Sequence, residues 1–161
     1  MIDRLHDALL ETATLTFEEM AFIVLEPFDD GPEEINPLVA STSVSFRGPF
    51  TGRLEVWASR DMLQTLASNM LGSEEIPPLL EQYDALGEIT NIICGNMLPK
   101  IAGSSAVFYL QGPKVGAEHQ DDGAAARIKL GMEPEQVDLL FYLQDKNFTE
   151  GVANDSSTGS R

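Results

Sequence analysis

Glu88 and Asn91 are the two side chains whose types and spacing are best suited to chemistry. They lie three residues apart within 79–102, a stretch with helical periodicity. Three residues span about 4.5 Å along a helix axis, so a carboxylate and a carboxamide can reach one small object. The amide can donate to and accept from the same water molecule. The alternative is an ordinary solvated helix face, on which Glu-x-x-Asn pairs recur by chance.

The residues around this pair form a polar stripe with two glycines. At 100° per residue, Asp84, Glu88, Asn91 and Gly95 fall within about 60° of each other. Gly87 and Gly95 each cost about 1 kcal/mol relative to Ala inside a helix, so they require a reason. Either they let a partner's backbone approach Glu88 and Asn91, or they relieve packing against a neighbouring helix. The opposite side of the helix is the predicted core face, made of Leu86, Ile89, Ile93 and Met97.

The remaining candidates for chemistry are few. Cys94 is the only cysteine, which excludes an intrachain disulfide and a cysteine-rich zinc site. His6 and His119 are the only histidines, and neither has a second soft ligand at metal-site spacing. Two ordinary histidines and a packing cysteine are the favoured interpretation, and no metal site is expected.

Charge and length limit the class of protein. Ten Lys and Arg stand against 26 Asp and Glu, a formal net charge of −16, which disfavours nucleic acid and anionic membrane surfaces as partners. No run of 18 apolar residues is present, and the N-terminal MIDRLHD is charged where a signal peptide would be apolar. A cytoplasmic protein without membrane insertion is expected. With 161 residues, the chain fits one domain with or without a tail.

The elements that must position the stripe follow from periodicity and turn residues. Ser59 and Gly72 are suited to cap a short helix between them, and Pro77–Pro78 precede the long helix. Residues 137–144 are apolar on both faces, which predicts a central or doubly covered strand. We expect helices at 2–24, 61–71 and 79–102, an acidic loop at 27–37, and strands at 38–46, 50–58, 106–111, 124–130 and 137–144.

This order predicts an α+β domain of two layers, a mostly antiparallel sheet with helices packed on one face. The domain is expected to occupy residues 1–144. Residues 145–161 lack apolar periodicity and are predicted to be a disordered C-terminal tail.

Residues 84–95, DALGEITNIICG, resemble the signature of the CheC/CheX/FliY chemotaxis phosphatases. In that signature an Asp or Ser precedes a Glu-x-x-Asn core, and a Pro follows about two dozen residues later. Pro113 matches it, with 21 residues between Asn91 and Pro113, one fewer than is usual. The resemblance is strong over 84–95 and extends more diffusely over 2–144, where the family's elements occur in the same order.

Family members differ in the number of Glu-x-x-Asn sites. Asp7, Glu11 and Thr14 repeat the spacing of Asp84, Glu88 and Asn91, but Thr14 stands where the amide should be. This repeat is either a decayed second site or a chance match. One intact site places the chain closest to the CheX-like branch, whose members form dimers. Trp57, Leu140 and Tyr142 are compatible with a dimer interface, unless a helix covers them.

The resemblance implies hydrolysis of the aspartyl phosphate of a CheY-type response regulator. Asn91 would orient the attacking water, and Glu88 would form an ion pair with the regulator's lysine. Asp84, Gly87 and Gly95 would contact the partner, although Asp84 also suits the helix dipole, and Pro113 is expected to be structural. The chain would carry no cofactor of its own, with Mg²⁺ in the regulator's pocket. A binding or scaffold domain without turnover, in chemotaxis or another two-component pathway, is the alternative.

Overall fold

The protein folds into three helices and one sheet in a computed structural model that describes residues 2–27, 37–116 and 123–144. The predicted acidic loop, His119 and the predicted tail lie mainly or wholly outside these residues. In chain order the elements are α1 (Ile2–Ala21), β1 (Glu26–Pro27), β2 (Leu38–Arg47), β3 (Gly52–Ser59), α2 (Arg60–Leu71), α3 (Leu79–Ala102), β4 (Tyr109–Leu110), β5 (Lys114–Val115), β6 (Ala126–Met132) and β7 (Glu135–Leu143).

The described strands form a single antiparallel sheet. Its order is β1-β6-β7-β3-β2-β4, and β5 also pairs with β2. The central pair is β3 and β7, in which Leu54 lies opposite Phe141 and Val56 opposite Leu139. The prediction that the last strand is central is therefore confirmed, and residues 136–142 are buried on both faces of the sheet.

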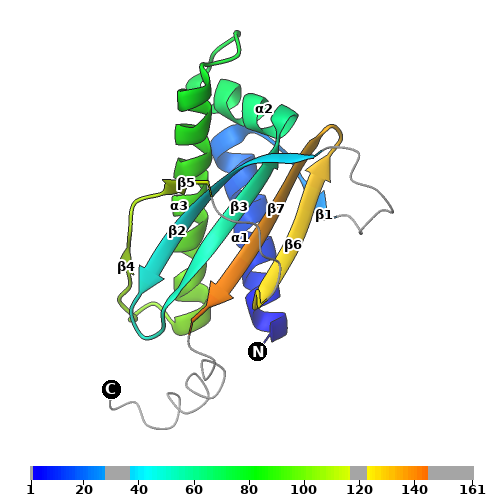
Figure 1. Ribbon diagram of the computed structural model, residues 1–161. Coiled ribbons are helices and arrows are strands. Elements are labelled where there is room, and N and C mark those ends of the chain that lie inside the picture. The colour runs from blue at the N-terminus through cyan, green and yellow to red at the C-terminus, as the bar shows by residue number, and fades with distance from the viewer. Residues whose placement is uncertain (1, 28–36, 117–122, 145–161) are drawn as a thin grey trace.

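All three helices pack on one face of the sheet, which confirms the predicted α+β architecture of two layers (Figure 1). The core lies between the layers, because α1 and α3 turn their apolar sides to the sheet. Leu86, Ile89, Ile93 and Met97 of α3 are all 0% exposed. The predicted core side of the long helix is thus confirmed.

Local signals explain the boundaries of the two later helices. Ser59 accepts a hydrogen bond from the Met62 backbone N–H at 3.3 Å and caps α2. Gly72 adopts a left-handed conformation, with φ 63°, and ends that helix as predicted. At the start of α3, Gln82 Nε2 donates to the Pro77 carbonyl at 2.7 Å.

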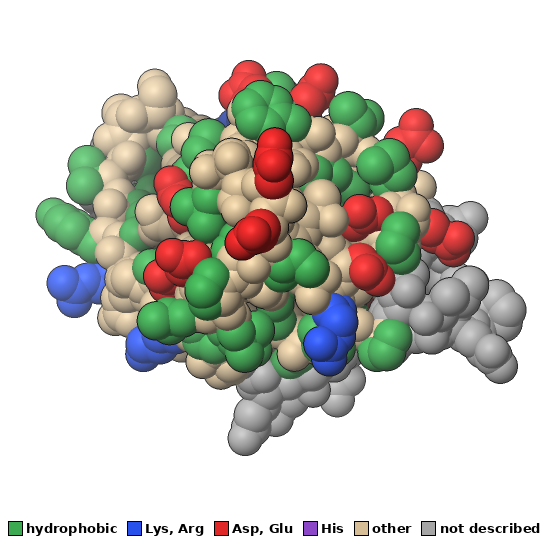
Figure 2. Space-filling model, turned by 90° about the horizontal axis from the view of Figure 1, so that it is seen from above, with side chains coloured by type: hydrophobic (Ala, Val, Ile, Leu, Met, Phe, Trp, Pro, Cys, Tyr) green, Lys and Arg blue, Asp and Glu red, His purple; other side chains and the backbone are tan. Residues whose placement is uncertain are grey.

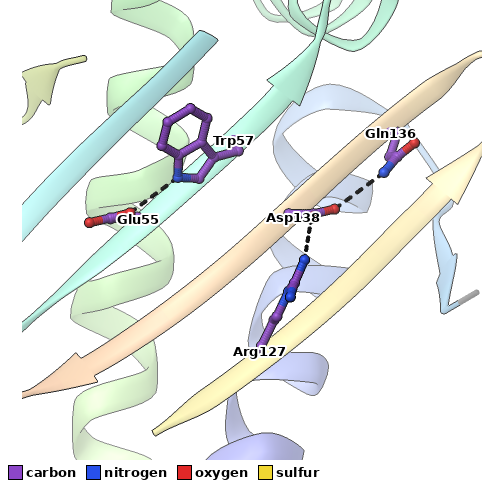
Figure 3. A network of polar contacts seen from close by, with 5 residues as sticks. All are labelled: Glu55, Trp57, Arg127, Gln136 and Asp138. Carbon is purple, nitrogen blue, oxygen red and sulfur yellow. Dashed lines mark hydrogen bonds and ion pairs between the residues drawn. The ribbon is translucent and has the colours of Figure 1, made fainter. Parts of the chain in front are cut away.

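The helix-free face of the sheet carries a polar network (Figure 3). Glu55 is 1% exposed and accepts from Trp57 Nε1 at 3.1 Å. Asp138 is fully buried and accepts from Arg127 and Gln136, each at 3.4 Å. Burial raises the pKa of Asp138, and its hydrogen bonds with Gln136 and Arg127 oppose this shift.

Two residues on this face do not fit the predicted dimer interface. Leu140 is 0% exposed and Tyr142 is 6% exposed, although no described helix covers them. Arg53 explains part of this burial, since its guanidinium lies 4.0 Å from the centre of the Tyr142 ring. These two residues therefore do not offer the apolar surface that a dimer interface on this face would need.

Strand boundaries differ from the predictions in the second half of the chain. The predicted strand at 106–111 is only Tyr109–Leu110, and Lys114–Val115 forms a further short strand that the pattern did not indicate. Two residues are too few to show alternation, which also explains why the sequence does not predict the strand Glu26–Pro27.

Among the residues that the structure describes, no helix combines the length and apolarity needed to cross a membrane.

Candidate functional site

Glu88 and Asn91 both lie exposed on the outer side of α3. Their neighbours in the chain, Gly87, Ile89 and Thr90, are buried. The two polar side chains therefore share one ridge, one helical turn apart, as their spacing predicts.

The rotation of α3 about its axis is fixed by buried hydroxyls. Thr90 Oγ1 donates to the Leu86 carbonyl at 2.8 Å and lies 2.6 Å from Thr42 Oγ1 on β2. Thr42 Oγ1 also reaches the Leu86 carbonyl, at 3.3 Å. Because the Thr42 hydroxyl is buried, turning the helix would break its contacts with α3 and leave it without a partner, at about 1–3 kcal/mol. The contact to β2 thus keeps Asn91 directed outward.

The two glycines of the stripe face the chain's own segment 109–115. A Cβ added at Gly87 would lie 3.0 Å from Pro113 Cβ, and one at Gly95 would lie 3.7 Å from Leu110 Cδ2. At Gly87 the close approach, for which a partner's backbone is one of the two predicted explanations, is made by Pro113, and Gly87 is buried. This neighbour lies in the connection between β4 and β5 and not in a helix, which was the other explanation. Gly95 is partly exposed, so it leaves space on the ridge.

The hydrophobic and turn patterns of the sequence do not predict that Pro113 lies near the site. It directly follows Gly112 and precedes β5, which pairs with β2 at Ser43 and Thr42. This pairing holds the segment along the sheet edge beside α3. The only sequence signal for this position is the proline of the family signature. In the structure, Pro113 lies beside Gly87 at one side of the ridge.

Asp84 extends the ridge toward the start of α3. It is exposed, one turn before Glu88. The helix begins at Leu79, so Asp84 lies beyond its first turn, where Glu81 is the acidic residue. Because the dipole effect fades within the first turn, the structural explanation for Asp84 is weak.

The surroundings are acidic. Seen from the end where α2 ends and α3 begins, Asp and Glu side chains are scattered over the surface, and the Lys and Arg side chains in view lie toward its margins (Figure 2). Hydrophobic side chains lie between them in this view. The end of α2, the following connection and the start of α3 carry Leu71, Ile76, Leu79 and Leu80, which are 56–74% exposed. A cationic group on a partner would therefore be attracted to this end of the molecule.

Other candidate groups do not join the ridge. Cys94 is fully buried, and burial raises the pKa of its thiol to about 12, so it is a packing residue. His6 is partly exposed on α1, 3.8 Å from Asp7. Within the described parts of the chain, no three His, Cys, Asp or Glu side chains come together as a metal site.

Solved structures of chemotaxis proteins share this fold. CheX from Desulfovibrio desulfuricans is 19% identical, with a TM-score of 0.69 over 87% of this chain and 99% of that one. The CheX–CheY–BeF3–Mg²⁺ complex from Borrelia burgdorferi contains a chain that is 16% identical, with a TM-score of 0.64 over 86% and 97%. FliY from Thermotoga maritima is 14% identical, with a TM-score of 0.59 over 94% and 95%.

Sequence comparison identifies the family. No protein of curated function matches the sequence significantly. The family model described as "Chemotaxis phosphatase CheX" matches residues 40–122, which include the ridge of α3. Because this match covers just over half of the sequence, the chain belongs to the CheX family of chemotaxis phosphatases.

Proposed function

We propose that this chain hydrolyses the aspartyl phosphate of a CheY-type response regulator on the exposed ridge of α3. The observation that carries the proposal is the joint exposure of Glu88 and Asn91 on a helix whose rotation is fixed by Thr90 and Thr42. The similar structure from Borrelia burgdorferi, a complex of CheX with CheY, supports a regulator as the partner.

The reaction makes modest demands on this chain. Water attacks the phosphorus of the acyl phosphate, the bond from phosphorus to the aspartate oxygen breaks, and a carboxylate and inorganic phosphate result. The carboxylate is a good leaving group, so a positioned water is the main requirement. Asn91 is suited to this role because its carboxamide accepts and donates without titrating.

Glu88 would dock the partner. An exposed carboxylate one turn from Asn91 can pair with a lysine on the regulator and so place the phosphoryl group opposite the amide. Asp84 and the open surface at Gly95 would extend this contact. Mg²⁺ would enter bound in the regulator's own pocket, so the proposal assigns no residue of this chain to a metal. The proposal includes a cytoplasmic location, where such regulators act.

The dimer remains a prediction from the resemblance. Since Leu140 and Tyr142 are buried, an interface would use other apolar side chains, for which the exposed Leu79 and Leu80 are candidates. Sedimentation of the wild type and of Leu80→Asp would test it. A monomer at micromolar concentration in the wild type would contradict it.

The test of the function separates docking from turnover. Phosphate release from a phosphorylated CheY-type regulator and binding of that regulator are measured for Asn91→Ala and Glu88→Ala. Asn91→Ala should lose turnover and retain most binding, whereas Glu88→Ala should weaken both. Glu81→Ala, an exposed acid on the same helix, serves as the control. Binding with no release by the wild type would instead favour the scaffold alternative.

A further inference from the structure

The polar ridge of α3 is too small to hold a protein partner by itself. From Asp84 to Gly95 it is about 16 Å long and about 10 Å wide, so its outer surface is on the order of 200 Å². Protein–protein interfaces cover about 600–800 Å² on each partner. The regulator of the proposed function must therefore also contact the surface beside the ridge.

The segment around β5 lies beside α3 and is tied to β2 (Figure 1). Gln111 N donates to the Ser45 carbonyl at 2.9 Å, and Gly116 N donates to the Ser41 carbonyl at 3.0 Å. Between these two hydrogen bonds, β5 pairs with β2. Because the backbone is held at several points, the segment presents its side chains in a fixed geometry, and a partner that docks there pays little conformational entropy.

Val115 is an exposed apolar side chain of this segment, on the same side of the sheet as α3. It lies opposite Thr42, and directly opposed residues point to the same face of a sheet. Thr42 points to α3, since its Oγ1 lies 2.6 Å from Thr90 Oγ1. Val115 therefore lies at the level of Thr90, the neighbour of Asn91, and it is 56% exposed. Lys114 points to the other face of the sheet.

The ridge and the β5 segment differ in chemistry, so they suit different parts of one partner. Asp84 and Glu88 are exposed carboxylates, which suit a lysine. Pro113 and Val115 are exposed and apolar, so they suit an apolar side chain. The centres of protein interfaces are poor in charge, and exposed ion pairs contribute little to affinity. An apolar contact beside Glu88 can supply what the ion pair does not.

We infer that β5 forms a second wall of the partner site and that Val115 is a specificity-determining residue of that wall. It contacts an apolar side chain that lies near the lysine of the regulator. The inference rests on the proposed function of α3. The β-branched side chain of Val115 has few rotamers, so ordering it in the complex costs little entropy. Val115 acts in binding, whereas Asn91 acts in turnover.

Two matched valine substitutions test this inference. Val115→Thr and Val107→Thr each replace a methyl group by a hydroxyl and retain the β-branched shape, at residues that are 56% and 63% exposed. Val107 is the control, because it lies beside Gly48, beyond the end of β2 and about 20 Å along the strand from Thr42.

The dissociation constant is measured for a CheY-type regulator loaded with beryllofluoride and Mg²⁺, and KM and kcat are measured for phosphate release. Val115→Thr should raise Kd and KM about five- to tenfold and leave kcat within about twofold. Val107→Thr should leave all three constants within about twofold of the wild type. An unchanged Kd for Val115→Thr, or an equal rise for Val107→Thr, would overturn the inference.

A conservative variant separates an apolar contact from a disturbance of β5. Val115→Leu remains apolar and should keep Kd within about twofold of the wild type. If it weakens binding as much as Val115→Thr does, the apolar contact is refuted. The two proposals fail differently: a wild-type chain that binds the loaded regulator but releases no phosphate overturns the proposed hydrolysis, while its Kd values still test Val115. An active wild type with unchanged Kd in Val115→Thr overturns only the second wall.

Discussion

Replacing each glycine of α3 by alanine should have opposite effects on stability. Alanine is favoured over glycine inside a helix by about 1 kcal/mol. At Gly95 the added Cβ meets only Leu110 Cδ2, at 3.7 Å, which is an ordinary contact. Gly95→Ala should therefore raise the free energy of unfolding by about 0.5–1 kcal/mol.

At Gly87 the added Cβ would lie 3.0 Å from Pro113 Cβ and 3.4 Å from its Cγ. The proline ring is stiff, and its segment is tied to β2 by the hydrogen bond from Gly116 N to the Ser41 carbonyl at 3.0 Å. Overpacking of this kind costs about 1–3 kcal/mol. After the gain in helix propensity, Gly87→Ala should lower the free energy of unfolding by about 0–2 kcal/mol.

Urea unfolding of both variants and the wild type measures these changes, with the m-value as a check on two-state behaviour. Equal stabilisation by both substitutions would refute the role assigned to Pro113. Phosphate release gives a second result: if Gly95 provides space for the partner, Gly95→Ala should raise KM although the fold is more stable. An unchanged KM would show that the partner does not approach there.

Three further substitutions or reactions test the packing that supports the site. Ser59→Ala should lower the free energy of unfolding by about 1–2 kcal/mol in urea, because Ser59 Oγ accepts from both Met62 N and Gln136 N; a loss below 0.3 kcal/mol would contradict the cap. Cys94 should resist alkylation in the native protein at pH 8, because its pKa of about 12 keeps it protonated and it is buried; rapid native labelling would contradict this. Burial raises the pKa of Asp138, so the folded chain retains its proton to higher pH than the unfolded chain. Stability should fall as pH rises from the ordinary Asp pKa to the raised value, and Asp138→Asn should remove this part of the slope in urea unfolding between pH 4 and 7. If the difference in free energy of unfolding between Asp138→Asn and the wild type is constant over this pH range, the raised pKa of Asp138 is contradicted.

Elements with local signals could be predicted from the sequence. The boundaries of α3 at Leu79 and Ala102 follow from Pro77–Pro78 and the apolar period, and α2 begins after Ser59 and ends before Gly72 as expected. The short strands could not be predicted, because β1, β4 and β5 have two residues each. Their existence depends on which longer strand offers a free edge, which is a property of the assembled sheet.

In the candidate site, too, some features could be predicted from the sequence and others could not. The outward direction of Glu88 and Asn91 follows from helical geometry and was predictable. The position of Pro113 against Gly87 depends on the pairing of β5 with β2, so the sequence left the neighbour of this glycine open between a partner and a second helix. The interface role suggested for Leu140 failed because alternation along a strand does not show what covers each face.

The most direct test of the central claim compares Asn91 with a second exposed asparagine of the same helix, Asn96. Phosphate release is measured in a single turnover, with the chain in saturating excess over a phosphorylated CheY-type regulator, so that binding does not limit the rate. Asn91→Ala should release phosphate about 10²–10³-fold more slowly than the wild type, the range found when one positioned polar group is removed from an active site. Asn96→Ala should match the wild type, and equal rates for the two variants would contradict the claim that Asn91 orients the water.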